Sequence, residues 1–292
     1  MLLAEPALQS PAIAHQRVDG AVRIEFAAAR SSTRLADLYQ RAPCRVLFPD
    51  TDAREPIQAV LLNTSGGLTC GDRIQVDIVA GPHTRATMTS QAAEKLYRAL
   101  PHGEPTQIDV RVDAGEDAYV EYLAQETILF DGARLRRRFC ADLARNARLL
   151  AVESIVFGRG AMGETLRHGF VHDAWRIRRN GRLLFADALH LDGDTAALRA
   201  APFGFGAATA CATLIYAADD ARELLAALRA RLREHARDDA AVAHATAREG
   251  LLIVRLLADD AAILRHALIH AAGALRALAA GYSVRLPQVW YC

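Results

Sequence analysis

The chain has 292 residues, of which 52% are hydrophobic and 24% are charged, a balance typical of a soluble globular protein that can bury a core. Its formal net charge of +1 argues against nucleic-acid binding, which usually requires a basic excess. The five scattered cysteines include no Cys-x-x-Cys pair, which excludes a disulfide framework and a zinc cage.

Short strands are predicted from about residue 21 to residue 190, because apolar residues alternate with polar ones along this part of the chain. The clearest alternation runs from Ile74 to Ile78, and turn signals rich in Gly and Pro separate the apolar segments. Asn180-Gly181 predicts a two-residue hairpin turn, since both residues tolerate a positive φ. One helix is expected inside this region, from Ser90 to Leu100, where alanines and a leucine recur at helical spacing.

Helical signals dominate the last third of the chain. A first helix is expected after Asp219-Asp220, because the segment has an acidic start and a basic end that complement the helix dipole. Residues 248–257 are typical of a strand. A second helix is expected from Asp259 to about Ala279, where apolar residues form a continuous stripe.

Together these elements predict an α+β fold that is predominantly β. Many short antiparallel strands are expected in stacked sheets, as in a sandwich or a β-helix, with one internal helix and two C-terminal helices. No linker rich in Pro, Gly or Ser interrupts the chain. Residues 1–292 are therefore interpreted as a single domain, with a β-rich body at about 20–205 and a helix–strand–helix part at about 206–292.

The segment from Asn63 to Asp72 contains three glycines within six residues, so its backbone must adopt conformations that a side chain would forbid. A phosphate-binding loop is one interpretation. However, the segment lacks the Gly-Lys-Ser/Thr ending of a P-loop, and a strand pattern rather than a helix follows it. A second interpretation makes Cys70 a nucleophile, although a small buried thiol in a tight turn explains the same residue.

A path for a metal ion is the third interpretation. Glu126, Glu153 and Glu164 stand within or beside apolar and Gly-rich segments, where an inward carboxylate is costly unless it is solvated, paired or coordinating. Carboxylate oxygens hold a divalent transition-metal ion less tightly than imidazole or thiolate does, which suits transfer rather than storage. The alternative is that these glutamates pair with arginines such as Arg159 or cap turns.

Other polar groups favour ordinary structural roles. His266 and His270 lie four residues apart on the second C-terminal helix, but no third metal ligand is evident in the sequence. His168 and His172 share that spacing in a strand-like region, where four residues span roughly 13 Å, too far for one ion. The basic run from Arg134 to Arg138 is interpreted as the solvated face of a strand.

Four segments also resemble motifs of one family. Residues 63–72, NTSGGLTCGD, resemble the NT-x-GG-L-x-x-GD pattern of the urease accessory protein UreD family (UreH in some organisms), with Cys70 where a glycine is frequent. Residues 125–133, QETILFDGA, are similar to its PQE-T-I-x-F-x-x-A segment, with Ala124 in place of proline. Residues 153–164 resemble its E-x(4)-GR-x-A-x-GE block, and residues 285–290 its closing R-x-P-R-x-W, with Gln288 where an arginine is common.

The four motifs occur in the family's order, so the chain is identified as a member of this family. The matched positions expected to shape the structure or bind a partner are Asn63, Thr64, Gly66, Gly67, Gly71, Asp72, Gly158, Arg159, Gly163 and Trp290.

This resemblance implies a scaffold that catalyses no covalent reaction and has no tightly bound cofactor. It is expected to bind the urease apoprotein, a helical UreF-type accessory protein and a nickel-loaded UreG-type GTPase. Ni²⁺ is expected to pass transiently along Glu126, Glu153 and Glu164 into the urease site.

The chain also lacks a signal-like N-terminus and any run of about 20 apolar residues, so we expect a cytoplasmic protein that binds neither nucleic acid nor a membrane. Two alternatives stay open. One is a cytosolic β-rich enzyme that uses the Gly-rich loop and Cys70; the other is a purely structural scaffold that transfers no metal.

Overall fold

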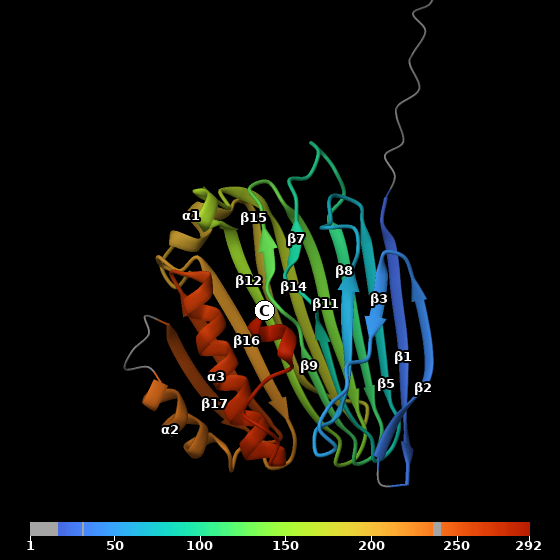
Figure 1. Cartoon of the computed structure of the whole chain (residues 1–292). Helices are drawn as coiled ribbons and strands as arrows, with labels where there is room; N and C mark the ends of the chain where they lie inside the picture. Colours follow the sequence, from blue (N-terminus) through green and yellow to red (C-terminus); the bar gives the residue numbers. More distant parts are fainter. Residues whose placement is uncertain (1–16, 31, 236–240) are drawn as a thin grey trace, which may run out of the picture.

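The structure is a computed structural model that describes residues 17–30, 32–235 and 241–292. Within these residues the chain forms two β-sheets that face each other, and helices cover the outer side of one sheet (Figure 1). No helix in this part of the chain is long and apolar enough to cross a membrane. The expectation about a signal-like N-terminus concerns residues 1–16, which lie outside the described residues.

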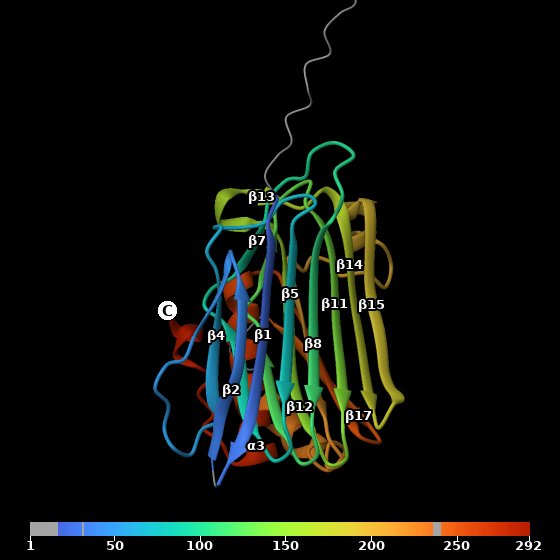
Figure 2. The ribbon, with the colours of Figure 1, turned by 90° about the vertical axis from the view of Figure 1, so that its right-hand side faces the viewer.

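The first sheet runs in the order β15–β14–β11–β8–β5–β1–β2, and Figure 2 shows most of these strands side by side. In that order the strands span Arg182–Asp194, His168–Arg179, Arg134–Leu143, Thr106–Ala114, Arg73–Ala80, Asp19–Ala29 and Ser32–Arg41.

The second sheet runs in the order β17–β18–β16–β12–β9–β6–β4–β3. In that order its strands span Val242–Arg248, Leu251–Ala258, Ala210–Ala217, Arg148–Arg159, Tyr119–Leu123, Arg85–Ser90, Ile57–Asn63 and Cys44–Leu47. Three short strands lie off this order: β10 (Thr127–Leu129) and β13 (Glu164–Thr165) pair with β12, and β7 (Glu94–Leu96) pairs with β10. The helices are α1 (Thr195–Ala200), α2 (Leu225–His235) and α3 (Ala261–Ala280), with 3-10 turns η1 (Gly160–Met162) and η2 (Gln288–Tyr291).

The predominantly β, α+β fold is confirmed, but the expectation of antiparallel strands is wrong for the centre of both sheets. From β5 to β14 the chain alternates between the sheets, so neighbouring strands within a sheet pair in parallel. Antiparallel pairing is found toward the edges, as in β1–β2 and β16–β18. The sequence could not decide this point, because inward and outward side chains alternate in the same way in parallel and antiparallel strands.

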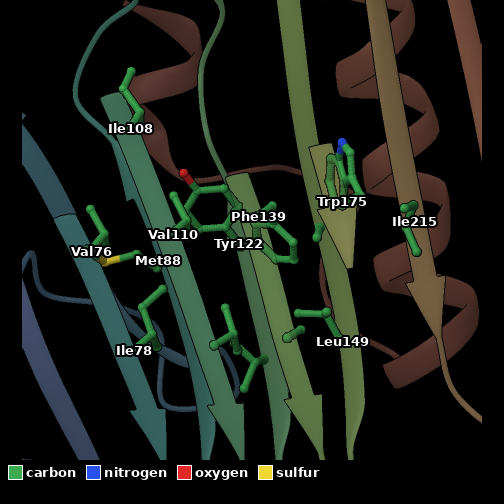
Figure 3. Packing of buried hydrophobic residues seen from close by; sticks show 14 of the residues in the cluster. Val76, Ile78, Met88, Ile108, Val110, Tyr122, Phe139, Leu149, Trp175 and Ile215 are labelled. Carbon is green, nitrogen blue, oxygen red and sulfur yellow. The ribbon is translucent and has the colours of Figure 1, made fainter. Parts of the chain in front are cut away.

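Two layers of core result from this arrangement. Parallel register stacks Val76, Val110, Phe139 and Trp175 in one row between the sheets, and Figure 3 shows how these side chains pack toward the second sheet. The Phe139 and Trp175 rings lie 4.6 Å apart. A second apolar layer packs α2 and α3 against the outer face of β12, β16 and β18.

The helix expected from Ser90 to Leu100 is wrong. This segment contains the short strand β7 and loops on either side. Leu96 is fully buried and pairs with Leu129 of β10, so tertiary packing overrides the local helical spacing.

The other predicted elements are confirmed in outline. Asn180 and Gly181 both have positive φ and join β14 to β15. Helix α3 begins after Asp260, whose carboxylate accepts hydrogen bonds from two backbone N–H groups of the first turn. Helix α2 begins only at Leu225, because residues 219–224 form turns. The predicted strand at 248–257 corresponds to β18, whereas β16 and β17 were not predicted.

Gly158 shows why one matched motif position must be glycine. It lies near the end of β12 with φ of +105°, and β13 folds back directly over it. A Cβ atom there would collide with the carbonyl oxygen of Glu164 and would lie 2.6 Å from Thr165 Cα. Both neighbours are backbone atoms and cannot turn away.

We expect Gly158→Ala to lower the free energy of unfolding by about 2–3 kcal/mol, because it adds backbone strain and displaces β13. Gly160→Ala is the matched control, since a Cβ at Gly160 meets nothing within 4 Å; its effect should stay within about 0.5 kcal/mol. Urea denaturation measures both values, and equal stabilities of the two variants would contradict this account.

Candidate functional site

The Gly-rich loop joins β4 of the second sheet to β5 of the first. Gly66, Gly67 and Gly71 have positive φ, and a Cβ at Gly67 would lie 2.6 Å from the Tyr97 ring. Asp72 is buried and closes the loop, because its two carboxylate oxygens accept hydrogen bonds from the backbone N–H groups of Val18 and Thr69, both at 2.8 Å. The loop is therefore held in one shape by its own side chains and backbone.

The loop does not form a phosphate cradle. A strand rather than a helix follows Asp72, as the sequence predicted, so no helix N-terminus is available for an anion. The N–H groups of Leu68 and Gly71 already donate to the carbonyl oxygens of Lys95 and Glu104. Thr64 likewise donates hydrogen bonds from both its N–H and its hydroxyl to the carbonyl oxygen of Pro43.

Cys70 sits in a packed environment. Its thiol is buried, and its sulfur accepts a long hydrogen bond of 3.5 Å from the Leu100 N–H. A Cβ at Gly103 would lie 2.7 Å from the same sulfur, so the chain closes tightly around it. These contacts match a structural thiol rather than a nucleophile oriented by a histidine.

A cavity of about 310 Å³ opens beside the loop, and Glu94 lies in its wall together with Asn63, Cys44 and Ser90. The Asn63 amide donates to both Glu94 carboxylate oxygens, at 3.0 and 3.1 Å. Burial raises the pKa of Glu94 to about 7, although the Asn63 hydrogen bond opposes this shift. The sequence analysis missed Glu94, because the helix expected there hid the inward direction of its side chain.

Glu153 lies between the two sheets, with its side chain only 1% exposed. The Arg137 Nε atom is 3.3 Å from one Glu153 oxygen, yet neither carboxylate oxygen accepts a hydrogen bond from any described residue. Burial raises the pKa of Glu153 to about 8 even though Arg137 acts to lower it. The same carboxylate, together with burial, raises the pKa of the Tyr122 hydroxyl.

Arg137 serves two acids at once. It binds Asp173 through two hydrogen bonds, of 2.9 and 2.7 Å, and donates a third to the Thr127 hydroxyl at 3.0 Å. The prediction of a solvated face for residues 134–138 is therefore wrong for Arg137, which is buried, and right for Arg136 and Arg138, which are exposed. One buried cation facing two carboxylates leaves an excess negative charge in the core when both acids are ionised.

Glu126 is placed elsewhere, directly before β10, and its side chain reaches α3. Its carboxylate pairs with Arg265 at 2.7 Å. Arg265 also donates to the Trp290 carbonyl oxygen at 2.9 Å, and its guanidinium lies 5.1 Å from the Trp290 ring centre. Trp290 is buried and donates its indole N–H to Thr89, so the family's closing motif anchors the C-terminal segment to the second sheet.

Glu164 begins β13 and pairs with Arg159 at the end of β12, whose guanidinium lies 4.1 Å from the Phe130 ring centre. Gly163 closes the adjacent turn with φ of 70°, and its N–H donates to the Gly160 carbonyl oxygen. The structure thus separates the three predicted glutamates into three environments and gives each an arginine partner, as the alternative in the sequence analysis expected.

Glu94 and Glu153 are nevertheless linked through neighbouring strands. Glu94 stands directly opposite Thr127 in the parallel pair β7–β10, and Thr127 stands opposite Ile155 of β12. Because Thr127 contacts Arg137 and Arg137 contacts Glu153, a polar series runs through the apolar core. We call the set Asn63, Glu94, Thr127, Arg137, Glu153 and Asp173 the interior series.

The histidines do not gather into a metal site. His266 and His270 line a surface groove, and His270 contacts the Arg231 carbonyl oxygen at 3.1 Å. The His172 ring lies 5.6 Å from the ring of His190, its partner across the strands. Across residues 17–30, 32–235 and 241–292, no three His, Cys, Asp or Glu side chains are grouped so that they could hold a metal ion.

Glu153→Gln should stabilise the protein at high pH. The folded pKa of about 8 lies above the ordinary value of 4.5, so wild-type protein loses stability as the pH rises through this window. The variant carries no such loss, and its advantage should grow from near zero at pH 4.5 to about 4–5 kcal/mol at pH 8.5. Thermal melts across this range measure it.

Asp173→Asn should destabilise the protein, because it removes the negative charge that pairs with the buried Arg137 through two hydrogen bonds. It should cost about 3–5 kcal/mol. If Glu153→Gln instead lowered the free energy of unfolding by a similar amount at every pH, Glu153 would be an ionised structural partner of Arg137.

Comparison with known proteins agrees with this assignment of motifs. Residues 18–291 match the family described as UreD urease accessory protein. The chain is 42% identical over 276 residues to a urease accessory protein UreD of Magnetococcus marinus, covering 94% of both chains. It is 42% identical over 284 residues to a UreD of Rhodopseudomonas palustris, covering 97% of both, and 43% identical over 277 residues to a UreD of a Methylobacterium species. The chain therefore belongs to the UreD family of urease accessory proteins.

Proposed function

We propose that this protein binds the urease apoprotein together with UreF-type and UreG-type accessory proteins, and that it passes Ni²⁺ toward the urease active site along the interior series. The observation that carries the proposal is Glu153, a carboxylate in an apolar core whose two oxygens accept no hydrogen bond from the described residues. Buried polar groups are normally satisfied, so an unsatisfied carboxylate is suited to a transient ligand such as a cation or water.

The protonation of the interior series supports this proposal. With pKa values of about 7 and about 8, Glu94 is partly protonated and Glu153 largely protonated near neutral pH, which lowers the cost of burying them. A divalent cation that enters can replace these protons. The Gly-rich loop and the cavity of about 310 Å³ beside it give such a cation access to Glu94.

Transfer also requires that the cation can leave. Oxygen ligands hold Ni²⁺ weakly compared with imidazole or thiolate, and Arg137 already occupies one side of Glu153. Both features limit affinity, as conduction through successive sites requires. Glu126 and Glu164 can bind the cation only if it competes with Arg265 and Arg159. We therefore assign Glu94 and Glu153 to the interior part of the path, and Glu126 and Glu164 to its outer ends.

The partner-binding surface is proposed to be a groove of about 1160 Å³ between α2, α3 and the C-terminal segment. Its apolar floor includes Ile269 and Leu278, and its charged lining consists of Arg231, Arg265 and Arg285. Among the described residues, the groove is lined by three arginines and no acidic side chain, so it suits an acidic amphipathic helix. A helical UreF-type protein is the accessory partner of this description.

Glu94→Gln and Glu153→Gln should each reduce nickel incorporation into co-expressed urease at least about tenfold, because each removes a carboxylate ligand while conserving shape. Metal analysis of purified urease measures incorporation, and pull-down of the partners confirms assembly. Transfer by the purified complex should also weaken from pH 8 to pH 6, since Glu94 and Glu153 then take up protons.

Two controls separate the alternatives. Cys70→Ala should leave urease activation intact. A loss of activation with the partners still bound would favour the alternative of an enzyme that uses the Gly-rich loop and Cys70. Unchanged nickel content in the double variant Glu94→Gln/Glu153→Gln, with the complex assembled, would instead favour a structural scaffold that transfers no metal.

Reversing charge in the groove should separate docking from passage. The double variant Arg231→Glu/Arg285→Glu changes two exposed side chains and should lower recovery of the UreF-type partner at least about tenfold through like-charge repulsion. Arg111→Glu is the control, because Arg111 is 59% exposed on the sheet that α2 and α3 do not cover. Undiminished recovery with the double variant would move the docking surface elsewhere.

A further inference from the structure

A second charged pocket lies away from the interior series, where two hairpins end. The turn between β14 and β15 and the turn between β17 and β18 border a cavity of about 770 Å³. Three arginines line it: Arg179, Arg182 and Arg248. The acidic residues in its lining are Asp219 and Glu249, so the pocket carries a net positive charge.

Arg179 is half-buried, and its guanidinium has an unusual environment. Its side chain is 15% exposed, and its Nε, Nη1 and Nη2 atoms are shielded from solvent and donate no hydrogen bond to any described residue. A guanidinium carries five N–H donors, and leaving them unused in a buried position is costly. The nearest acid is Asp219, whose carboxylate lies 3.2 Å from Nη1 but is 70% exposed.

The other two arginines add to this cost rather than relieve it. Arg182 stands directly opposite Arg179 across the hairpin, where like charges repel. Arg248 is held at the pocket by a hydrogen bond to the Leu184 carbonyl oxygen. Three cations thus converge on a cavity, and a ligand that brings negative charge and several acceptor oxygens would offset both the repulsion and the unused donors.

We propose that this pocket binds a small oxyanion of the size of phosphate or bicarbonate, held by Arg179 with Arg182 and Arg248. The planar guanidinium of Arg179 matches two oxygens of such an anion. When the pocket is free, the Asp219 carboxylate occupies the place of the anion beside Arg179. When the anion binds, this carboxylate rotates away toward solvent. The proposal does not depend on nickel transfer, because none of these residues belongs to the interior series or to the partner groove.

Titration of the purified full-length protein with inorganic phosphate tests the proposal. At constant ionic strength, with chloride as the reference salt, the melting temperature should rise and then saturate, because the anion binds the folded state. Isothermal titration calorimetry should give the same affinity. Bicarbonate in a parallel series distinguishes a planar oxyanion from a tetrahedral one, and saturable binding of either supports the site.

Substitutions at the pocket mouth keep the test independent of folding. Arg182→Ala and Arg248→Ala should each weaken anion binding about tenfold, the equivalent of one lost charge-assisted hydrogen bond. Arg41→Ala is the control, because Arg41 is exposed on β2, outside this pocket, and should bind like wild type.

Asp219→Asn gives the sharpest result. If Asp219 occupies the anion's position, the variant should bind phosphate several-fold more tightly and should regain with phosphate the stability that it loses without it. A purely structural Arg179–Asp219 pair predicts a loss of stability that phosphate does not restore. That result, an absence of saturable binding in wild type, or equal binding by wild type and both arginine variants would overturn the proposal.

Discussion

Between β5 and β14 the chain passes back and forth between the two sheets through its long strands, and this constraint organises the molecule. Because every crossing adds one strand to each sheet, residues from distant segments must stack in register in the space between the sheets. The rows are mostly apolar, and any polar side chain that points inward must find its partners from the neighbouring strands. Arg137, between Asp173 and Glu153, is the clearest case.

Much of this architecture could be predicted from the sequence. Alternation along Ile74–Ile78 and the turn at Asn180-Gly181 are local signals, and both are confirmed. Strand direction could not be predicted, because it depends on where each connection leads. The helix expected from Ser90 to Leu100 was wrong for a related reason, since Leu96 is fixed by a partner strand more than 30 residues away.

The candidate site shows the same division. The family motifs located the Gly-rich loop and Glu153 by sequence alone. Glu94 and Arg137 were missed, because their importance comes from facing inward beside Thr127, which no local pattern reveals. An arginine within a basic run is read as exposed unless the phase of the strand is known, and here the phase places Arg136 and Arg138 outside and Arg137 inside.

Membership of the UreD family fits a body of this kind. A rigid stacked core can hold carboxylates at fixed positions without gathering them into a cluster that retains a metal. The groove is lined by α2, α3 and the C-terminal segment, whereas Arg137, Glu153 and Asp173 of the interior series lie between the two sheets. The docking and the passage that we propose therefore involve separate parts of the molecule.

At the start of β10, consecutive side chains point to opposite sides of the second sheet. Glu126 and Thr127 are consecutive, yet one reaches Arg265 beneath α3 and the other reaches Arg137 between the sheets. Side chains alternate strictly along a strand, so inserting or deleting a single residue here would exchange the two faces. The Glu126 carboxylate would then point into the apolar layer between the sheets, and the Thr127 hydroxyl would point away from Arg137. The spacing of Glu126 and Thr127 is therefore a tighter constraint on this part of the chain than the length of an exposed loop would be.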